Sequence, residues 1–362
     1  MPPRPLRRLP QLEARKTALE NCVFCPKLCR SACPVSNAEP TETLTPWGKM
    51  SMVYFVATES VEATEAFARP AWGCTGCGAC REQCDHKNEV APTLLAARAG
   101  LYEAGLAPAA ARAVVDGFDA HAAELAKAAE RAAPRKDSRI KLLVGCGYLR
   151  RQPDETAAAL KVTEALLGPA ELLPQCCGLP LLEAGDVRGF MRQGEEIRRA
   201  VAGADRVVVV DPGCASAMRK GYAQAGAPLG VKVELLVEVA YAEIARFSRV
   251  TGEVPALRYH DPCKLGRGLG IYEEPRALLT RVTGRAPLEF PYARGASACA
   301  GGGGLVPQTM PEVARGIAAR RADEHRAAGG GEVVTACSSS LASLRRAGAA
   351  ASDLVTWLAR GI

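Results

Sequence analysis

The chain has 362 residues, enough for two or three domains, with 48% hydrophobic and 23% charged residues. This composition is typical of a folded globular protein and excludes a mainly disordered chain. The apolar runs are strand-sized, so the sequence predicts no transmembrane helix. Aromatic residues make up only 5%, and the net charge of +7 accompanies no recognition motif, so we expect no nucleic-acid partner. The unusual count is the 15 cysteines.

Residues 1–20 are predicted to form a basic N-terminal arm, in which Arg4, Arg7 and Arg8 lie among prolines. No apolar stretch and no small-residue cleavage site follow these arginines, so we expect no secretory signal. Cysteines of a chain that stays inside the cell more often bind metal or do redox chemistry than form disulfides. We therefore expect a cytoplasmic protein, or one bound peripherally at the inner face of the membrane.

Residues 21–136 are predicted to form a helical ferredoxin module with two [4Fe–4S] sites. Its eight cysteines fall into two groups, spaced Cys22-x2-Cys25-x3-Cys29-x3-Cys33 and Cys74-x2-Cys77-x2-Cys80-x3-Cys84. The second spacing is that of a bacterial ferredoxin half, in which three thiolates hold one cluster and the fourth Cys serves the other. On that pattern the first cluster takes Cys22, Cys25, Cys29 and Cys84, and the second takes Cys74, Cys77, Cys80 and Cys33.

The first cysteine group departs from this spacing by one extra residue between Cys25 and Cys29. A pair of zinc sites is the alternative, because Cys-x2-Cys also suits zinc. Eight cysteines in two ferredoxin-like halves exceed what zinc needs, which favours iron. The intervening stretch Met50–Ala68 has helical character, so we expect the module to be all-helical.

From Arg139 onwards, short apolar runs alternate with helical stretches. The predicted strands are Ile140–Val144, Arg206–Val210, Val231–Leu236, Leu257–Tyr259 and Glu332–Thr335. The predicted helices are Asp154–Leu167, Val187–Ala202, Glu274–Val282 and Pro311–Ala327. This alternation is typical of βαβ units, so we expect an α/β fold with parallel sheets, joined to the helical module by a linker over residues 133–137.

The α/β region repeats itself, and we divide it into a first repeat over residues 139–250 and a second repeat over residues 256–362. The first repeat contains Cys146, Cys176, Cys177 and Cys214, and the second contains Cys263, Cys299 and Cys337. Cys176 and Cys214 stand 38 positions apart, as do Cys299 and Cys337. This equality favours a duplication and aligns Ala300 with Cys177.

These residues carry a family resemblance. The Cys-Cys-Gly segment that begins at Cys176, together with Cys146 and Cys214, resembles the cysteine-rich CCG domain, and Tyr259–Arg276 closely resembles the D subunit of heterodisulfide reductase. The layout of residues 20–360 is similar to that subunit's wider relatives, such as the glycolate oxidase iron–sulfur subunit and the C subunit of anaerobic glycerol-3-phosphate dehydrogenase. The resemblance implies duplicated CCG domains and clusters that pass electrons between a flavin dehydrogenase and a quinone or thiol acceptor.

The sequence departs from this family where further cysteines are expected. Ala217 and Ser340 occupy the last position of the closing Cys-x2-Cys, and Ala300 replaces the second Cys of the second Cys-Cys-Gly. The first repeat keeps four cysteines, enough for a third iron–sulfur cluster. The second repeat keeps three, so it takes a further ligand such as Ser340 or water, leaves an iron open to substrate, or is empty.

Two further motifs lie in the second repeat. The run Gly301–Gly304 predicts a loop against a cluster or a partner's cofactor, with a plain flexible turn as the alternative. Asp261 is expected to cap a helix after Pro262. The alternative for this motif is a hydrogen bond from His260 to a cluster sulfur.

The resulting hypothesis is an iron–sulfur electron-transfer subunit of a larger oxidoreductase, with two [4Fe–4S] clusters and a third iron–sulfur cluster. We expect no bound flavin or NAD, since Gly145-Cys146-Gly147 lacks the third glycine of a dinucleotide loop. The expected partners are a flavin-containing dehydrogenase or an electron-transfer flavoprotein, and a membrane quinone-reactive subunit. The catalytic residues are unknown. The alternatives are a disulfide or thiol reductase acting at a CCG-domain cluster, and a zinc-stabilised interaction scaffold.

Overall fold

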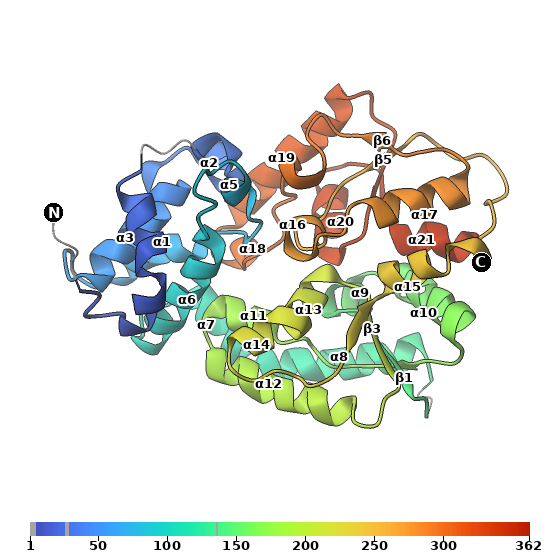
Figure 1. Ribbon diagram of the computed structural model, residues 1–362, viewed down its shortest axis with the longest axis horizontal. Coiled ribbons are helices and arrows are strands. Elements are labelled where there is room, and N and C mark those ends of the chain that lie inside the picture. The colour runs from blue at the N-terminus through green and yellow to red at the C-terminus, as the bar shows by residue number, and fades with distance from the viewer. Residues whose placement is uncertain (1–4, 26–28, 135–136) are drawn as a thin grey trace. The chain divides into compact units, whose positions relative to one another are not determined.

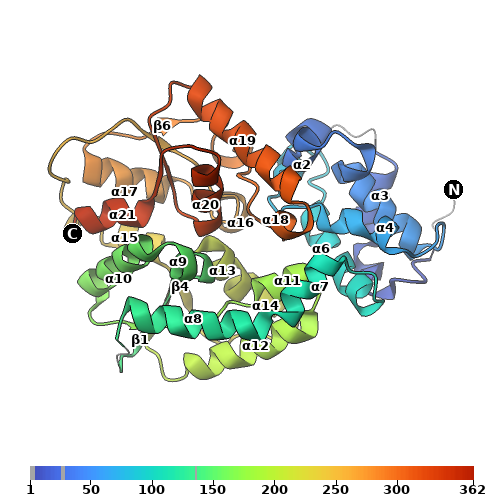
Figure 2. The same cartoon turned by 180° about the vertical axis from the view of Figure 1, so that it is seen from behind.

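A computed structural model describes residues 5–25, 29–134 and 137–362 of the chain (Figures 1 and 2). Arg4 of the predicted arm and residues 135–136 of the predicted linker lie outside these described residues. The chain divides into two compact units. The first unit comprises the residues up to Gly117 together with segments 180–189 and 298–321, and the second comprises residues 118–179, 190–297 and 322–362.

The first unit is helical, and its described residues contain no strand, as expected for the predicted ferredoxin module. Its elements along the N-terminal part are η1 Pro10–Arg15, α1 Lys16–Val23, η2 Arg30–Ala32, α2 Pro34–Ala38, η3 Glu42–Leu44, α3 Pro46–Ala57, α4 Glu65–Ala68, η4 Arg69–Trp72, α5 Ala79–Glu82, α6 Val90–Glu103 and α7 Ala109–Asp116. The later segments add most of α11 Leu179–Ala184 and α18 Val306–Thr309. The predicted helical stretch Met50–Ala68 is thus divided between α3 and α4.

The N-terminal segment packs into the first unit, which differs from the predicted arm. Leu6, Leu9 and Leu12 are almost completely buried, in the same core as Met50 and Trp72. These three leucines recur every third residue, so the segment presents one apolar face to the core. The basic residues of this segment therefore flank a buried stripe and do not form a free arm.

The first sheet of the second unit has four parallel strands. They are β1 Ile140–Leu143, β2 Glu171–Leu172, β3 Arg206–Val209 and β4 Val233–Leu235, in the order β2-β1-β3-β4. The helices of this region are α8 Phe118–Ala132, α9 Cys146–Arg151, α10 Pro153–Leu167, α12 Val187–Ala200, α13 Pro212–Ser216, η5 Ala217–Gly221, α14 Tyr222–Gln224 and α15 Leu236–Ala242. The continuous apolar run of β3 is buried, as expected for a central parallel strand.

The second sheet repeats this plan. Its parallel strands are β5 Leu257–Tyr259, β6 Leu288–Glu289, β7 Glu332–Thr335 and β8 Ala351–Asp353, in the order β6-β5-β7-β8. The accompanying elements are η6 Ile244–Arg246, α16 Gly266–Leu269, α17 Glu273–Thr283, η7 Arg294–Ala296, α19 Pro311–Ala327, α20 Ser338–Arg346 and α21 Leu354–Arg360. The equal strand order of the two sheets confirms the predicted duplicated α/β fold.

The five predicted strands and four predicted helices of the α/β region are all present, with ends within a few residues of the expected ones. The three strands that were not predicted, β2, β6 and β8, are edge strands of two or three residues. Strands this short have no apolar run of their own.

The border between the compact units lies at Gly117, upstream of the predicted linker. Helix α8 therefore belongs with the first sheet, where it packs against α9 and α10, although the sequence placed it with the ferredoxin module. Its buried residues Phe118, Leu125, Ala128 and Ala129 recur at helical spacing and form the packing face. No helix among the described residues has the length and apolar character needed to cross a membrane.

Candidate metal centres

The structure brings together the four thiols of the predicted first cluster in the first unit. Burial, together with the charges of the neighbouring Cys29, Cys84 and Cys25, raises the pKa of Cys22 to about 12. Burial likewise raises the pKa of Cys29 to about 11, with contributions from Cys84 and Cys25. Asn88 donates a hydrogen bond from Nδ2 to Cys22 Sγ at 2.9 Å.

The four thiols of the predicted second cluster form another group in the same unit. Burial raises the pKa of Cys80 well above its usual range, and the charges of Cys74, Cys77 and Cys33 add to that effect. Gly76 has a φ of 68°, in the left-handed region, and its N–H donates to Cys74 Sγ at 3.4 Å. A glycine is needed for this turn because other residues are strained at such a φ.

A buried cation faces the second thiol group. Lys49 on α3 is 1% exposed, and its Nζ lies 3.5 Å from Cys33 Sγ. Among the described residues Lys49 has no carboxylate partner, and its charge also acts on Cys74. A buried ammonium without an anion is costly, whereas a thiolate-bound iron–sulfur cluster is anionic. The residues present therefore fit an iron–sulfur group at this site.

The four-glycine run lies against the second thiol group. A Cβ at Gly304 would clash with the carbonyl oxygen of Cys74, so only glycine permits this approach. Arg98 on α6, which is almost fully buried, donates hydrogen bonds to the carbonyl oxygens of Cys74 at 2.8 Å and Gly304 at 3.1 Å. A segment of the second repeat thus supports the backbone of the predicted ferredoxin ligands.

The four cysteines of the first repeat meet at the carboxyl edge of the first sheet. Cys146 begins α9 directly after β1, Cys176 and Cys177 follow β2, and Cys214 lies in α13 after β3. The four thiols are close enough to act on one another's pKa in the order Cys146, Cys176, Cys177 and Cys214. Carboxyl ends of parallel strands lie at one edge of a sheet, which explains why residues so far apart in sequence converge.

Backbone contacts hold these thiols in place. The Asp211 carboxylate caps α13 by accepting a hydrogen bond from the Gly213 N–H at 2.8 Å. The Tyr222 hydroxyl donates to the carbonyl oxygen of Cys177 at 3.0 Å. A hydrogen bond from Cys177 lowers the pKa of Cys214, but burial and the nearby Asp211 outweigh it and raise that pKa to about 12. Four neighbouring thiols with raised pKa values, three of them buried, ionise together only if a cation compensates them, so this donor set fits a bound metal group.

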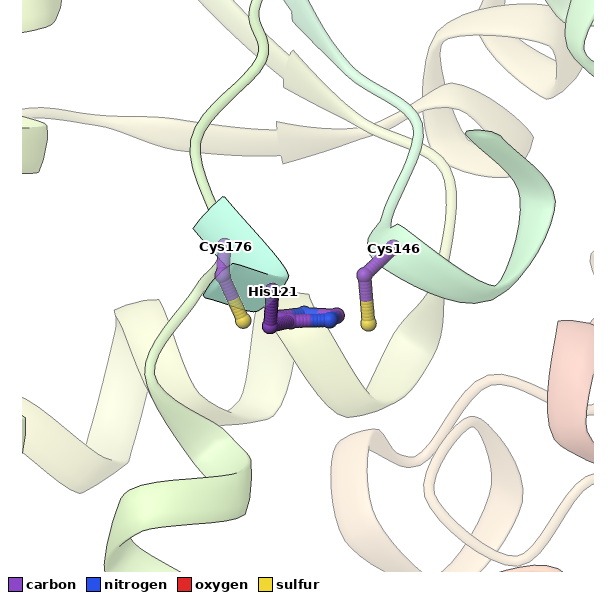
Figure 3. Close-up of side chains that lie close together, drawn as sticks. All are labelled: His121, Cys146 and Cys176. Carbon is purple, nitrogen blue, oxygen red and sulfur yellow. The ribbon is translucent and has the colours of Figure 1, made fainter. Parts of the chain in front are cut away.

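A histidine that the sequence analysis did not single out joins this thiol group. His121 lies on α8, and a ring nitrogen of His121 and the sulfurs of Cys146 and Cys176 all lie within 4.8 Å of one another. Figure 3 shows the imidazole between the two sulfurs. His121 stands 25 positions before Cys146, in a stretch that the sequence assigned to another domain. No sequence motif marks His121, so its place beside the thiols is evident only from the packing of α8 in the structure.

The thiols of the second repeat are divided between the two units. Cys263 and Cys337 belong to the second unit, where burial, Asp211 and Cys263 raise the pKa of Cys337. Ser340 hydrogen-bonds to Cys337 through both its backbone and its side chain. Cys299 belongs to the first unit, and its Sγ accepts a hydrogen bond from the Gly301 N–H at 3.2 Å. The structure therefore brings Cys263 and Cys337 together within the second unit.

The prediction that Asp261 caps a helix is wrong. Helix α16 begins only at Gly266 and has no side-chain cap. The Asp261 carboxylate instead accepts two hydrogen bonds from the buried Arg276, at 2.7 and 2.8 Å, and one from the Arg294 N–H at 2.7 Å. A guanidinium with two parallel donors competes well for a carboxylate, so this residue serves a buried ion pair.

Comparison with known families agrees with this arrangement. Residues 18–88 match the 4Fe-4S dicluster domain, and residues 140–219 and 257–345 each match the cysteine-rich domain CCG. The fold and the thiol groups define an iron–sulfur protein in which a helical dicluster module accompanies two α/β cysteine-rich domains. The matches to both domain models confirm the resemblance of the sequence to the CCG-domain iron–sulfur subunits.

Three curated relatives illustrate the similarity. The chain is 29% identical over 319 residues to the B subunit of the CoM/CoB fumarate reductase of Methanothermobacter marburgensis, a match that covers 84% of this chain and 63% of that protein. It is 25% identical over 350 residues to the D subunit of the dihydromethanophenazine:CoB–CoM heterodisulfide reductase of Methanosarcina barkeri, covering 84% and 83%. It is 29% identical over 275 residues to a "Probable membrane-anchored ferredoxin" of Chromohalobacter salexigens, covering 67% and 40%. The chain thus spans less than two thirds of the first and the third of these relatives.

Proposed function

We propose that the chain is an iron–sulfur electron-transfer subunit of a multi-subunit oxidoreductase. The observation that carries this proposal is the convergence of eight cysteines into two four-thiol groups within one helical unit, with the buried Lys49 facing one of them. The names of two relatives, subunits of a fumarate reductase and of a heterodisulfide reductase, support its role as a component of an oxidoreductase.

The proposed ligand sets follow the two thiol groups and the first repeat. The first [4Fe–4S] cluster takes Cys22, Cys25, Cys29 and Cys84, the second takes Cys74, Cys77, Cys80 and Cys33, and a third takes Cys146, Cys176, Cys177 and Cys214. Clusters bound at these thiols would accept and release single electrons. The second repeat keeps three cysteines, Cys263, Cys299 and Cys337, one fewer than a [4Fe–4S] cluster takes, and is proposed to hold no cluster.

The electron donor in this proposal is a flavin-containing dehydrogenase or an electron-transfer flavoprotein. The acceptor is a quinone, reached through a membrane partner, or another redox protein. A cytoplasmic location, with peripheral contact at the inner face of the membrane, belongs to the same proposal. The similarity to a protein named as a membrane-anchored ferredoxin supports this membrane-side role.

A second candidate function is reduction of a disulfide or thiol substrate at the first repeat. The names of the two reductase relatives, which specify CoM and CoB, favour it. The sequence opposes it, because Ala217 and Ser340 stand where the family places further cysteines. The match to the 4Fe-4S dicluster domain disfavours the remaining alternative, a zinc-stabilised scaffold.

Metal analysis of the full chain, purified anaerobically, tests the proposal. We expect about twelve irons and an equal amount of acid-labile sulfide per chain, as three [4Fe–4S] clusters require. Dithionite should produce EPR signals of reduced clusters, and a soluble quinone such as menadione should reoxidise them. Fewer than four irons together with stoichiometric zinc would contradict an electron-transfer role. A change in the EPR spectrum on adding a disulfide, in the absence of any quinone reactivity, would instead favour the reductase.

A further inference from the structure

The imidazole of His121 belongs to the thiol group of the first repeat, yet it lies outside every proposed ligand set. Its ring packs beside Phe118, with ring centroids 5.9 Å apart, which fixes the ring at the edge of α8. The sulfurs of Cys146 and Cys176 lie on either side of the imidazole in Figure 3. What this ring can do there depends on which of its nitrogens carries the proton.

Arg150 settles the position of that proton. Its Nη1 lies 2.9 Å from His121 Nδ1, and a guanidinium can only donate hydrogen bonds. Nδ1 is therefore the acceptor, and a neutral imidazole that accepts at Nδ1 carries its proton on Nε2.

The proton on Nε2 is the one that this ring can offer to the neighbouring thiol group. Nε2 is buried, and no hydrogen-bond partner is found for it among the described residues. A buried N–H that lacks an acceptor costs free energy, so a nearby acceptor is needed. The sulfurs of Cys146 and Cys176 lie within 4.8 Å of a ring nitrogen of His121 and of each other. Cys176 and burial raise the pKa of Cys146, and the nearby His121 opposes them. Thiolate sulfur is the acceptor that this N–H would find once the cysteines bind iron.

Direct binding of iron by His121 agrees less well with this geometry. A metal needs the lone pair of Nε2, which would move the proton to Nδ1. That N–H would then point at an N–H donor of Arg150 at 2.9 Å, and two donors would face each other. The four thiols of the first repeat already provide the ligands of one [4Fe–4S] cluster.

We propose that His121 donates a hydrogen bond from Nε2 to the metal-bound sulfur of Cys146 or Cys176, and that Arg150 holds the ring in the donating tautomer. The inference rests on the proposed cluster in the first repeat. A hydrogen bond to cluster sulfur stabilises the form with the additional electron, because that form carries more negative charge on sulfur. His121 is thus a positioning and tuning residue for this site, and the one-electron reduction takes up no proton from it.

The test compares two variants of the full chain, reconstituted with iron and sulfide under anaerobic conditions. His121→Phe keeps a ring of similar shape but has no donor, and His121→Gln keeps an N–H donor. In an EPR-monitored redox titration we expect His121→Phe to lower the equilibrium constant for reduction of the third cluster about tenfold, which corresponds to 59 mV. His121→Gln should restore part of this loss, and the midpoints of the two ferredoxin clusters should not change.

A spectroscopic readout separates donation from ligation. After exchange into D₂O, the reduced third cluster should show a coupled deuteron in the wild type that is absent in His121→Phe. A strong nitrogen coupling that changes on ¹⁵N-histidine labelling would show direct ligation and overturn the proposal, as would a loss of four irons in His121→Phe. Twelve irons with an unshifted midpoint would overturn the inference alone. A wild-type chain with only eight irons would overturn the proposed third cluster, and the inference with it.

Discussion

The two repeats have the same sheet and different thiol sets. In the first repeat, four cysteines follow three consecutive strands of the sheet β2-β1-β3-β4, and their thiols touch in turn within one compact unit. In the second repeat, the sheet β6-β5-β7-β8 has the same order, but Ala300 replaces one cysteine and Cys299 belongs to the other unit. The strand order of the fold therefore does not depend on the complete set of metal ligands.

The difference extends to the loop that contains Cys299. In the first repeat, the Cys-Cys-Gly turn stays with its own sheet, and the Gln193 amide donates to the carbonyl oxygen of Cys176 at 3.0 Å. In the second repeat, the corresponding segment 298–321 packs in the first unit, where Arg98 joins Gly304 to Cys74. The glycine-rich loop of the second repeat thus supports the backbone of a ferredoxin-type ligand.

Removing two cysteines from each repeat is the strongest test of this comparison. Cys176→Ala with Cys214→Ala should lower the iron content from about twelve to about eight per chain, because one [4Fe–4S] cluster is lost. Cys263→Ala with Cys337→Ala should leave about twelve irons. Iron and sulfide analysis checks both results, and the EPR signals of the ferredoxin clusters report that each variant is folded. A loss of four irons from the second pair would show that both repeats bind a cluster.

The sequence predicts the part of this comparison that depends on local pattern. The apolar run at Arg206–Val209 and the equal spacing of Cys176–Cys214 and Cys299–Cys337 define the repeats, because buried parallel strands and fixed loop lengths leave a direct pattern in the sequence. The grouping of the eight ferredoxin-type cysteines follows from spacing in the same way.

The rest of the site depends on packing between distant segments, which leaves no local pattern. His121 reaches the thiols of the first repeat only because α8 packs against α9. The contact of Gly304 with Cys74 joins residues 230 positions apart. Asp261 was assigned to a helix cap on a local rule, but the buried Arg276 from α17 competes for its carboxylate. The roles of His121, Gly304 and Asp261 therefore depend on contacts with segments that are distant in the sequence.

A glycine substitution tests whether the loop of the second repeat supports the first unit. Gly304→Ala should destabilise the protein by about 3 kcal/mol, because the new Cβ meets the Cys74 carbonyl at a left-handed φ. Gly330→Ala is the matched control: Gly330 has the same φ of 67° as Gly304, but no atom lies within 4 Å of its Cβ position. It should lose only about 1 kcal/mol. Thermal unfolding and the EPR signal of the second cluster measure the effect, and equal losses would contradict a supporting role.

The charges around the thiols sharpen the contrast between the first unit and the repeats. The ammonium of Lys49 faces Cys33, whereas the carboxylate of Asp211 acts on both Cys214 and Cys337. Lys49→Met should lower the midpoint potential of the second cluster by on the order of 100 mV, since a nearby positive charge stabilises the reduced form. Lys127→Met, at an exposed position of α8, is the control and should leave that midpoint unchanged. An unshifted midpoint in Lys49→Met would place the cluster elsewhere.

The smallest expected effect concerns a buried contact that joins the two repeats. The Tyr148 hydroxyl of the first repeat donates to Asp353 Oδ2 of the second at 2.6 Å, and burial raises the pKa of Asp353 from 3.8 to about 7. Just below pH 7 the folded chain keeps this proton while the unfolded chain has already released it. The stability that this proton provides is therefore lost as the pH rises through 7.

The resulting prediction is a difference in pH dependence between variants. From pH 6 to pH 8 the wild type should lose about 1.4 kcal/mol more than Asp353→Asn, because the amide of the variant carries no proton that titrates in this range. Asp323→Asn, at a mostly exposed position of α19, is the control and should follow the wild type. Thermal unfolding at both pH values measures the difference. If Asp353→Asn lost stability as steeply as the wild type, the prediction would be wrong. The Asp353 carboxyl group would then already be ionised at pH 6, and the contact between the repeats would contain a negative charge.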